Sequence, residues 1–211
     1  MPGILPRAMM VLVVAVAARR ARGQAGSDSL RDTTPAATPA ASAGAAMLAM
    51  PAEARNYKLV DSTSLASDAA GMQYQYAHDH DTIYVFVAPY QSSDKVGTHD
   101  ETTNFVLGEV DGFYESIYLA ARQSALDRVQ LLHRGSEDLQ THGHYVIAAA
   151  IWARRTKRGT SGRVDVFTYY AVYALPHEVV RLRAEMPWTT AANFEVVAFT
   201  KALIAGLAAQ Y

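Results

Sequence analysis

The alternation of apolar and polar residues in the middle of the chain predicts β-strands. In residues 71–77 (GMQYQYA), methionine or tyrosine stands at every second position, with glutamine between them. This period of two is typical of a strand with one buried face. Residues 82–88 (TIYVFVA) are β-branched or aromatic almost throughout, which indicates a strand covered on both faces, and Pro89 is expected to end it.

A helix is predicted next, because the spacing of the apolar residues changes. Thr98 stands three residues before Glu101, the spacing of a capping box, in which two side chains bind the first free N–H groups of a helix. The helix is expected to run to about Gln123. Its apolar residues are three or four positions apart and form one stripe: Val106, Val110, Phe113, Ile117 and Ala121.

The rest of the chain predicts further strands and a closing helix. The expected strands lie in Leu126–Arg134, His144–Arg155, Arg163–Leu175 and His177–Met186. The closing helix, from about Asn193 to Ala209, is apolar around most of its girth and is therefore expected to be well buried. The order is β-β-α-β-β-β-β-α. Short polar turns between neighbouring strands imply an α+β fold, in which helices pack on an antiparallel sheet.

This order resembles a known family. A tyrosine-rich hairpin (YQYAHDHDTIYVFVAP), two tyrosine-rich meander strands and a closing helix are similar to the PsbP-like α/β/α sandwich over about residues 70–211. The resemblance implies a small, non-enzymatic, extracytoplasmic accessory or binding protein. It transfers no binding residue to this chain, because no motif matches position by position.

The amino terminus predicts export. Arg7 is followed by an uninterrupted apolar run, Ala8–Ala18, and GQA at residues 23–25 offers the small residues that signal peptidase reads. The run is well short of the roughly 20 residues needed to span a bilayer. Three arginines after the run oppose translocation, so the alternative is an uncleaved helix on the inner membrane surface: Arg19, Arg20 and Arg22.

Composition divides the chain into three parts. We expect a signal peptide at residues 1–25, cleaved near Ala25, and a linker at residues 26–54 that is rich in alanine, proline, serine and threonine. Few of its side chains are bulky and apolar, so folding would not offset its loss of conformational entropy. A globular domain is expected at residues 55–211. The mature chain is therefore predicted to be periplasmic or secreted, without a transmembrane span.

Charge and cysteine content exclude several classes of protein. The formal net charge is −1, which gives no long-range attraction to nucleic acid, and we expect no nucleic-acid partner. The sequence has no cysteine, so neither a disulfide nor a zinc thiolate can stabilise the fold. No cofactor is expected.

The sequence HDHD at residues 78–81 has two interpretations. His78 and His80 could be two zinc ligands on one strand face, and a second His-x-His pair, His142 and His144, could meet them if both loops lay at one end of the sheet. Aspartate, however, is favoured in turns, where its side chain binds nearby N–H groups. We therefore predict that HDHD is the turn of a hairpin and that no metal site is present.

The densest positive charge lies in one predicted hairpin, and it is the candidate site for an anion or a partner. Its basic residues are Arg154, Arg155, Lys157, Arg158 and Arg163. They would suit phospholipid headgroups, other phosphates or an acidic protein. The alternative is a solubilising turn that keeps sheet edges from pairing. Arg181 and Arg183 are expected to share one face of the next strand.

The sequence has none of the local motifs of common enzymes. It contains no Gly-x-Ser-x-Gly elbow, phosphate-binding loop, His-Glu-x-x-His or dinucleotide fingerprint, and no catalytic residue is predicted. The expected function is therefore that of an exported, non-catalytic binding or accessory protein of the cell envelope. The alternatives are a metal-binding protein that uses the His-x-His pairs and a hydrolase whose site is not visible in sequence.

Overall fold

The computed structural model describes residues 48–65, 71–91, 94–124, 127–141, 144–159 and 162–211. The predicted signal peptide and residues 26–47 of the predicted linker lie outside these ranges. The strands are β1 (Glu53–Ala54), β2 (Tyr57–Ser64), β3 (Met72–His78), β4 (Asp81–Pro89), β5 (Arg128–Thr141), β6 (His144–Gly159), β7 (Gly162–Ala174) and β8 (Glu178–Pro187). The helices are α1 (His99–Gln123) and α2 (Thr190–Ala208).

The strands form one eight-stranded antiparallel sheet in the order β1-β2-β3-β4-β8-β7-β6-β5. The predicted α+β class is confirmed. Two strands that the pattern did not indicate, β1 and β2, precede the predicted order. The second of them, YKLVDSTS, is exposed along most of its length, so it lacks the alternation that marks a half-buried strand.

The folded domain begins before the predicted boundary at residue 55. Leu48 is 8% exposed and belongs to the main hydrophobic core, and Glu53–Ala54 pairs with β2. Ala49 exchanges two hydrogen bonds with the side chain of Gln210, of 3.0 and 2.8 Å. Residues 48–54 therefore belong to the domain, because a few apolar side chains and backbone bonds are enough to fix this short segment.

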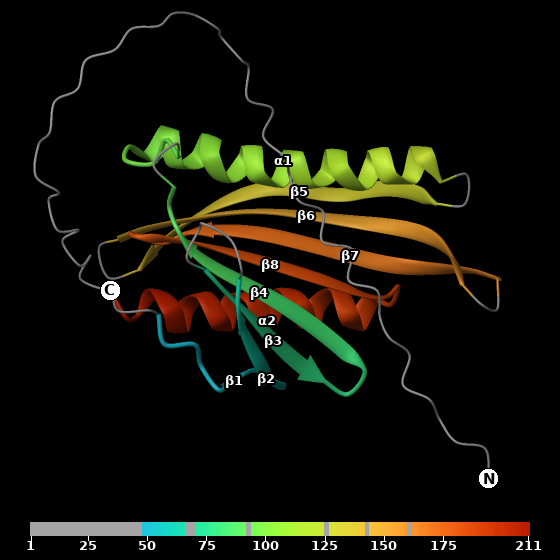
Figure 1. Ribbon diagram of the computed structural model, residues 1–211, viewed down its shortest axis with the longest axis horizontal. Helices are drawn as coiled ribbons and strands as arrows, with labels where there is room; N and C mark the ends of the chain where they lie inside the picture. The colour runs from blue at the N-terminus through green and yellow to red at the C-terminus, as the bar shows by residue number, and fades with distance from the viewer. Residues whose placement is uncertain (1–47, 66–70, 92–93, 125–126, 142–143, 160–161) are drawn as a thin grey trace, which may run out of the picture. The chain divides into compact units, whose positions relative to one another are not determined.

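The two helices lie on opposite faces of the sheet, and each face has its own core (Figure 1). Successive side chains of a strand point to opposite faces, so each strand contributes to both. Tyr76, Ile83, Phe167 and Leu182 pack with α2, whereas Ile147, Ala149 and Val172 pack with α1. We call these the α2 side and the α1 side of the sheet.

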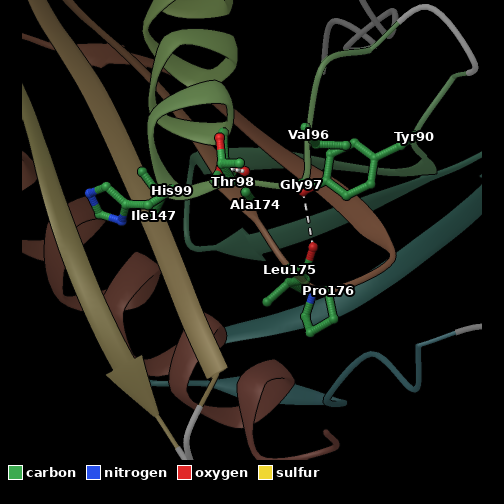
Figure 2. A pocket seen from close by; sticks show the side chains of 10 residues that line it. Tyr90, Val96, Gly97, Thr98, His99, Ile147, Ala174, Leu175 and Pro176 are labelled. Atoms are coloured by element: carbon green, nitrogen blue, oxygen red, sulfur yellow. Dashed lines mark hydrogen bonds between the residues drawn. The ribbon is translucent and has the colours of Figure 1, made fainter.

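The register of the strands defines two ends of the sheet. Ile83 pairs with Ala184, Val166 with Pro187 and Gly159 with Gly162. The β1–β2, β3–β4 and β6–β7 turns and the start of α2 therefore lie at one end, called the distal end. The β5–β6 and β7–β8 turns lie at the other, called the proximal end, where α1 also begins, near Leu175 (Figures 1 and 2).

The predicted capping box at the start of α1 is confirmed. The hydroxyl of Thr98 accepts a hydrogen bond from the backbone N–H of Glu101, and the Glu101 carboxylate accepts one from the N–H of Thr98. The predicted apolar stripe faces the sheet, with Val106, Val110, Ile117 and Ala121 buried. Phe113 stacks on Tyr170 of β7, with ring centroids 4.0 Å apart.

Replacing Thr98 with alanine is expected to lower the free energy of unfolding by about 1 kcal/mol, because the first turn of α1 loses a side-chain acceptor. Urea denaturation measures the change. Thr98→Ser keeps the hydroxyl and serves as the control, with a smaller expected loss. Equal losses in both variants would show that the hydroxyl contributes nothing as a cap.

Candidate functional site

HDHD forms the hairpin turn that the sequence predicts. His78 and Asp81 are the last pair of the β3–β4 ladder, so only Asp79 and His80 form the loop, which is shorter than the predicted four residues. Asp79 has φ 51°, in the left-handed region that aspartate tolerates better than most residues. The conformation of the turn therefore accounts for an aspartate at position 79.

His78 and His80 lie at the opposite end of the sheet from His144. The HDHD turn lies at the distal end, whereas His144 begins β6 at the proximal end and pairs with Thr141. His142 and the side chain of His144 lie outside the described residues. Among the residues described, no three histidine or acidic side chains are grouped as a metal ion requires. The register therefore contradicts the four-histidine site considered from the sequence.

The predicted basic cluster is divided between the two faces of the sheet. Arg155 and Lys157 lie on the α1 side, where both contact Glu185 of β8. Arg154 lies on the α2 side, where it pairs with Asp165 of β7 and its guanidinium sits 5.3 Å from the ring of Trp188. The cluster is divided because successive side chains of a strand point to opposite faces of the sheet.

Three of the five predicted cations are therefore neutralised within the protein. Arg155 is 10% exposed in its side chain and bonds both Glu185, at 2.8 Å, and Asp127, at 3.2 Å. Burial alone would raise the pKa of Glu185, but Lys157 and the neighbouring arginines hold it below its ordinary value. These residues form a structural ion-pair network on the α1 side, and they are not free to bind an anion.

Arg158 and Arg163 differ from the other three. They face each other across the β6–β7 ladder and are exposed on the α2 side, at the distal end. Neither makes an ion pair with any residue that the structure describes. Two like charges directly opposite each other destabilise a strand pair, so this placement is not explained by folding stability. The prediction of an anion-contacting surface stays open for these two residues.

Arg181 and Arg183 share the α1 side, as the strand period predicts. Arg181 pairs with Glu109 of α1, and Arg183 lies over the ring of Phe113, 5.7 Å from its centroid. Arg134 of β5 pairs with Asp111 of α1, with bonds of 2.6 Å. These arginines hold α1 on the sheet and do not extend the basic surface of the β6–β7 hairpin.

A hollow of about 250 Å³ lies at the proximal end, between the start of α1 and the β7–β8 turn (Figure 2). The hydroxyl of Tyr90 donates a 2.9 Å hydrogen bond to the carbonyl of Leu175, and burial raises its pKa above the ordinary value. Thr102 donates its hydroxyl to the carbonyl of Thr98. The hydroxyl groups that line the hollow are thus engaged in holding the backbone.

His99 stands at the rim of this hollow and pairs with Asp138 of β5. Its Nε2 lies 3.3 Å from a carboxylate oxygen of Asp138, and both side chains are about half exposed. Figure 2 shows the ring directed away from Tyr90, on the other side of Thr98. The pair joins the first turn of α1 to β5, and no described serine lines the hollow beside it.

The outer face of α2 carries an apolar surface that the sequence did not predict. Phe194 is 72% exposed, the largest fraction of any large apolar side chain in the described part of the chain. A shallow hollow beside it is lined by the following residues: Val197, Ala198, Ala202, Arg55 and Lys201. The expectation that α2 is well buried is therefore wrong for this face, although its inner residues Phe199 and Leu203 are fully buried.

Arg55 reaches this surface from the β1–β2 turn, where it has φ 56°. The strand register places this turn and the β6–β7 hairpin at the distal end of the sheet, where α2 also begins (Figure 1). We call the surface formed by Phe194, Arg55 and Lys201, together with Arg158 and Arg163, the distal surface. It combines an exposed aromatic ring with four cations for which the structure shows no ion pair among the described residues.

The fold and this surface define a class: a two-helix, antiparallel α+β domain with an apolar and basic face at one end of its sheet. The chain is similar in structure to the cyanobacterial PsbP protein (CyanoP) of Synechocystis sp. PCC 6803. The two are 8% identical, with a TM-score of 0.43, and the match covers 78% of this chain and 96% of that one. No protein-family model and no curated protein sequence matches the chain. The structural likeness says nothing about what this chain binds.

Proposed function

We propose that this chain is an exported, non-catalytic binding module of the cell envelope, and that its contact site is the distal surface. The supporting observation is the exposure of Phe194, with apolar neighbours on α2 and the cations Arg55 and Lys201 beside it. An exposed aromatic residue on a helix face costs free energy in water, and a contiguous apolar patch with a polar rim is typical of an interaction site.

The signal-like amino terminus supports export, which places the partner in the envelope or outside it. No helix in the described part of the chain has both the length and the apolar character needed to cross a membrane. The exposure of Phe194 supports a contact made by the surface of the folded domain.

Retention on envelope material tests this proposal. The wild-type protein, mixed with washed cell envelopes, is expected to sediment with them, and Phe194→Ser together with Arg158→Ala and Arg163→Ala is expected to lower the bound fraction strongly. Leu119→Ser serves as the matched control, because Leu119 is an apolar residue of α1 that is 54% exposed and lies on the other side of the sheet. If the triple variant binds as well as the control variant, the distal surface is not the contact site.

A further inference from the structure

The chemistry of the distal surface favours one class of partner. We propose that this surface binds the headgroup region of an anionic lipid bilayer, with Phe194 entering the boundary between headgroups and acyl chains. This inference rests on the proposed function, since it names the partner of the same surface. Three features support it: the shape of the apolar part of the surface, the position of the cations, and the repulsion between like charges that a dimer through this surface would create.

The apolar part consists of one large ring among small side chains. Phe194 projects from the outer face of α2, and Ala198 and Ala202 stand one and two turns further along the same face. Helices that lie in a membrane interface bury such an apolar face by several ångströms and keep their polar residues toward water. The alanines offer neither a hydrogen-bond pattern nor a deep pocket for a specific protein side chain, and a bilayer requires neither.

Two cations lie beside this ring, and two more lie farther away, on the same side of the sheet and at the same end. Arg55 and Lys201 line the same hollow as Phe194, and Arg158 and Arg163 are exposed on the same side at the same end. Long basic side chains can keep their stems on apolar surface while their charged groups reach phosphates. Buried cations elsewhere in the domain are paired with carboxylates, as Arg155 is with Glu185 and Asp127. The four cations of the distal surface are left for a partner.

The surface is not uniformly basic. Glu195 is exposed beside Phe194, and Asp81 lies at the β3–β4 turn. Burial of the Tyr57 hydroxyl, with smaller contributions from Asp81 and Glu195, raises the pKa of Tyr57 to about 12. Asp79, in the same β3–β4 turn, and Glu53, two residues before Arg55, are also exposed at this end. The hollow beside Phe194 itself is lined by two cations and no carboxylate, so an anionic layer is attracted at short range while the net charge of the chain gives little long-range attraction.

A second aromatic residue lies on the α2 side at the distal end. Trp188 follows β8, is half-buried, and packs near Phe167 with ring centroids 6.0 Å apart. The guanidinium of Arg154 lies over the Trp188 ring, 5.3 Å from its centroid. Tryptophan is enriched where protein meets the headgroup region, because its body is apolar and its N–H is polar. The position of Trp188 agrees with an orientation in which the distal end of the domain faces the bilayer.

A second copy of the chain fits this surface less well. Two copies joined through Phe194 by a two-fold axis would bring the Arg55 and Lys201 of one copy toward the same residues of the other. Like charges that meet in an interface cost free energy, and the hollow itself is lined by no carboxylate that could offset them. An anionic bilayer complements the same four charges directly.

Vesicle sedimentation tests the proposal. The whole protein is mixed with vesicles of phosphatidylcholine and phosphatidylglycerol, and with vesicles of phosphatidylcholine alone. We expect binding to the first, weak binding to the second, and release from the first in high salt. All variants keep the same amino terminus, so its apolar run contributes equally to each and differences report on the distal surface.

The expected changes in partition coefficient follow from the two kinds of contact. Phe194→Ser is expected to lower it by about 10- to 100-fold, from the loss of a buried aromatic ring. Arg158→Ala with Arg163→Ala is expected to lower it by about 10- to 30-fold, at roughly fivefold for each cation near the surface. Leu119→Ser and Arg134→Ala, both on the α1 side, are expected to leave binding unchanged.

Three results would overturn the lipid inference. The first is equal binding of the distal variants and the α1-side variants to anionic vesicles. The second is that the protein does not bind vesicles but does bind cell envelopes, and that protease treatment of the envelopes abolishes this binding. That result would identify a protein partner and leave the proposed function standing. The third is a concentration-dependent dimer that Phe194→Ser dissociates, seen by light scattering, which would assign the surface to a second copy.

Discussion

Phe199→Ala is expected to lower the free energy of unfolding by about 3 to 5 kcal/mol, because it leaves a cavity in a close-packed core. Phe199 is 0% exposed and lies on the inner face of α2. Its ring meets Tyr57 and Tyr76 edge-on, with centroids 5.1 Å away in each case. It thus joins α2 to β2 and β3, two strands near the edge of the sheet. Urea denaturation followed by circular dichroism measures the loss.

The same helix offers a matched control, Phe194→Ala. The substitution is identical, but Phe194 is largely exposed, so the free energy of unfolding is expected to change by less than about 0.5 kcal/mol. Comparable losses at the two positions would contradict the packing of α2 described here. A small change at Phe194 also means that its variants report on binding and not on folding.

Glu185→Ala is expected to lower the free energy of unfolding by about 2 to 3 kcal/mol, somewhat less than for a fully buried pair, since Glu185 keeps 24% of its side chain exposed. The loss arises because Arg155, 10% exposed in its side chain, and Lys157 would lose their shared carboxylate. Glu195→Ala, at an exposed position of α2, is the control and is expected to cost little. A neutral result for Glu185→Ala would show that desolvation cancels the attraction in this network.

The same network gives a dependence of stability on pH. The pKa of Glu185 lies below its ordinary value in the folded protein, since its cations outweigh the effect of burial. Its stabilising contribution is therefore complete above the unfolded-state value of 4.5 and is lost as the pH falls through the lower folded-state value. Stability of Glu185→Gln should depend less on pH than that of the wild type in this acid range, measured by denaturation at successive pH values.

The central strands were predictable because their patterns depend on local physics. The alternation in residues 72–76 and the β-branched run in 82–88 reflect burial on one or both faces, and both became strands with the expected neighbours. The turn at HDHD and the capping box at Thr98 likewise depend on a few adjacent residues. Strand β2 lies near the sheet edge and is mostly exposed, so burial left little pattern in it.

The division of the basic cluster required the register of the sheet. Arg154, Arg155 and Lys157 are close together in the sequence. The carboxylates that they contact are set by the alignment of β6, β7 and β8, and Glu185, which contacts Arg155, is thirty residues away from it. The period of two alone predicts that Arg154 and Arg155 point to opposite faces. It does not predict which carboxylates lie opposite them.

The exposed face of α2 was missed although one signal for it was present. Each face of the sheet is covered by a single helix, so a helix that is apolar all round must expose part of its apolar surface to solvent. The sequence of α2 suits a helix buried on all sides equally well, so its apolar character alone did not indicate that its outer face is uncovered by the described residues.

The central claim is that the distal surface contacts the partner in the envelope, and labelling tests it most directly. The chain has no cysteine, so Phe194→Cys and Leu119→Cys each provide one site for a dye whose emission depends on polarity. When the labelled proteins bind cell envelopes, we predict a blue shift of the emission at position 194 and none at position 119. Binding that shifts the emission at position 119 alone, or at neither position, would contradict the claim.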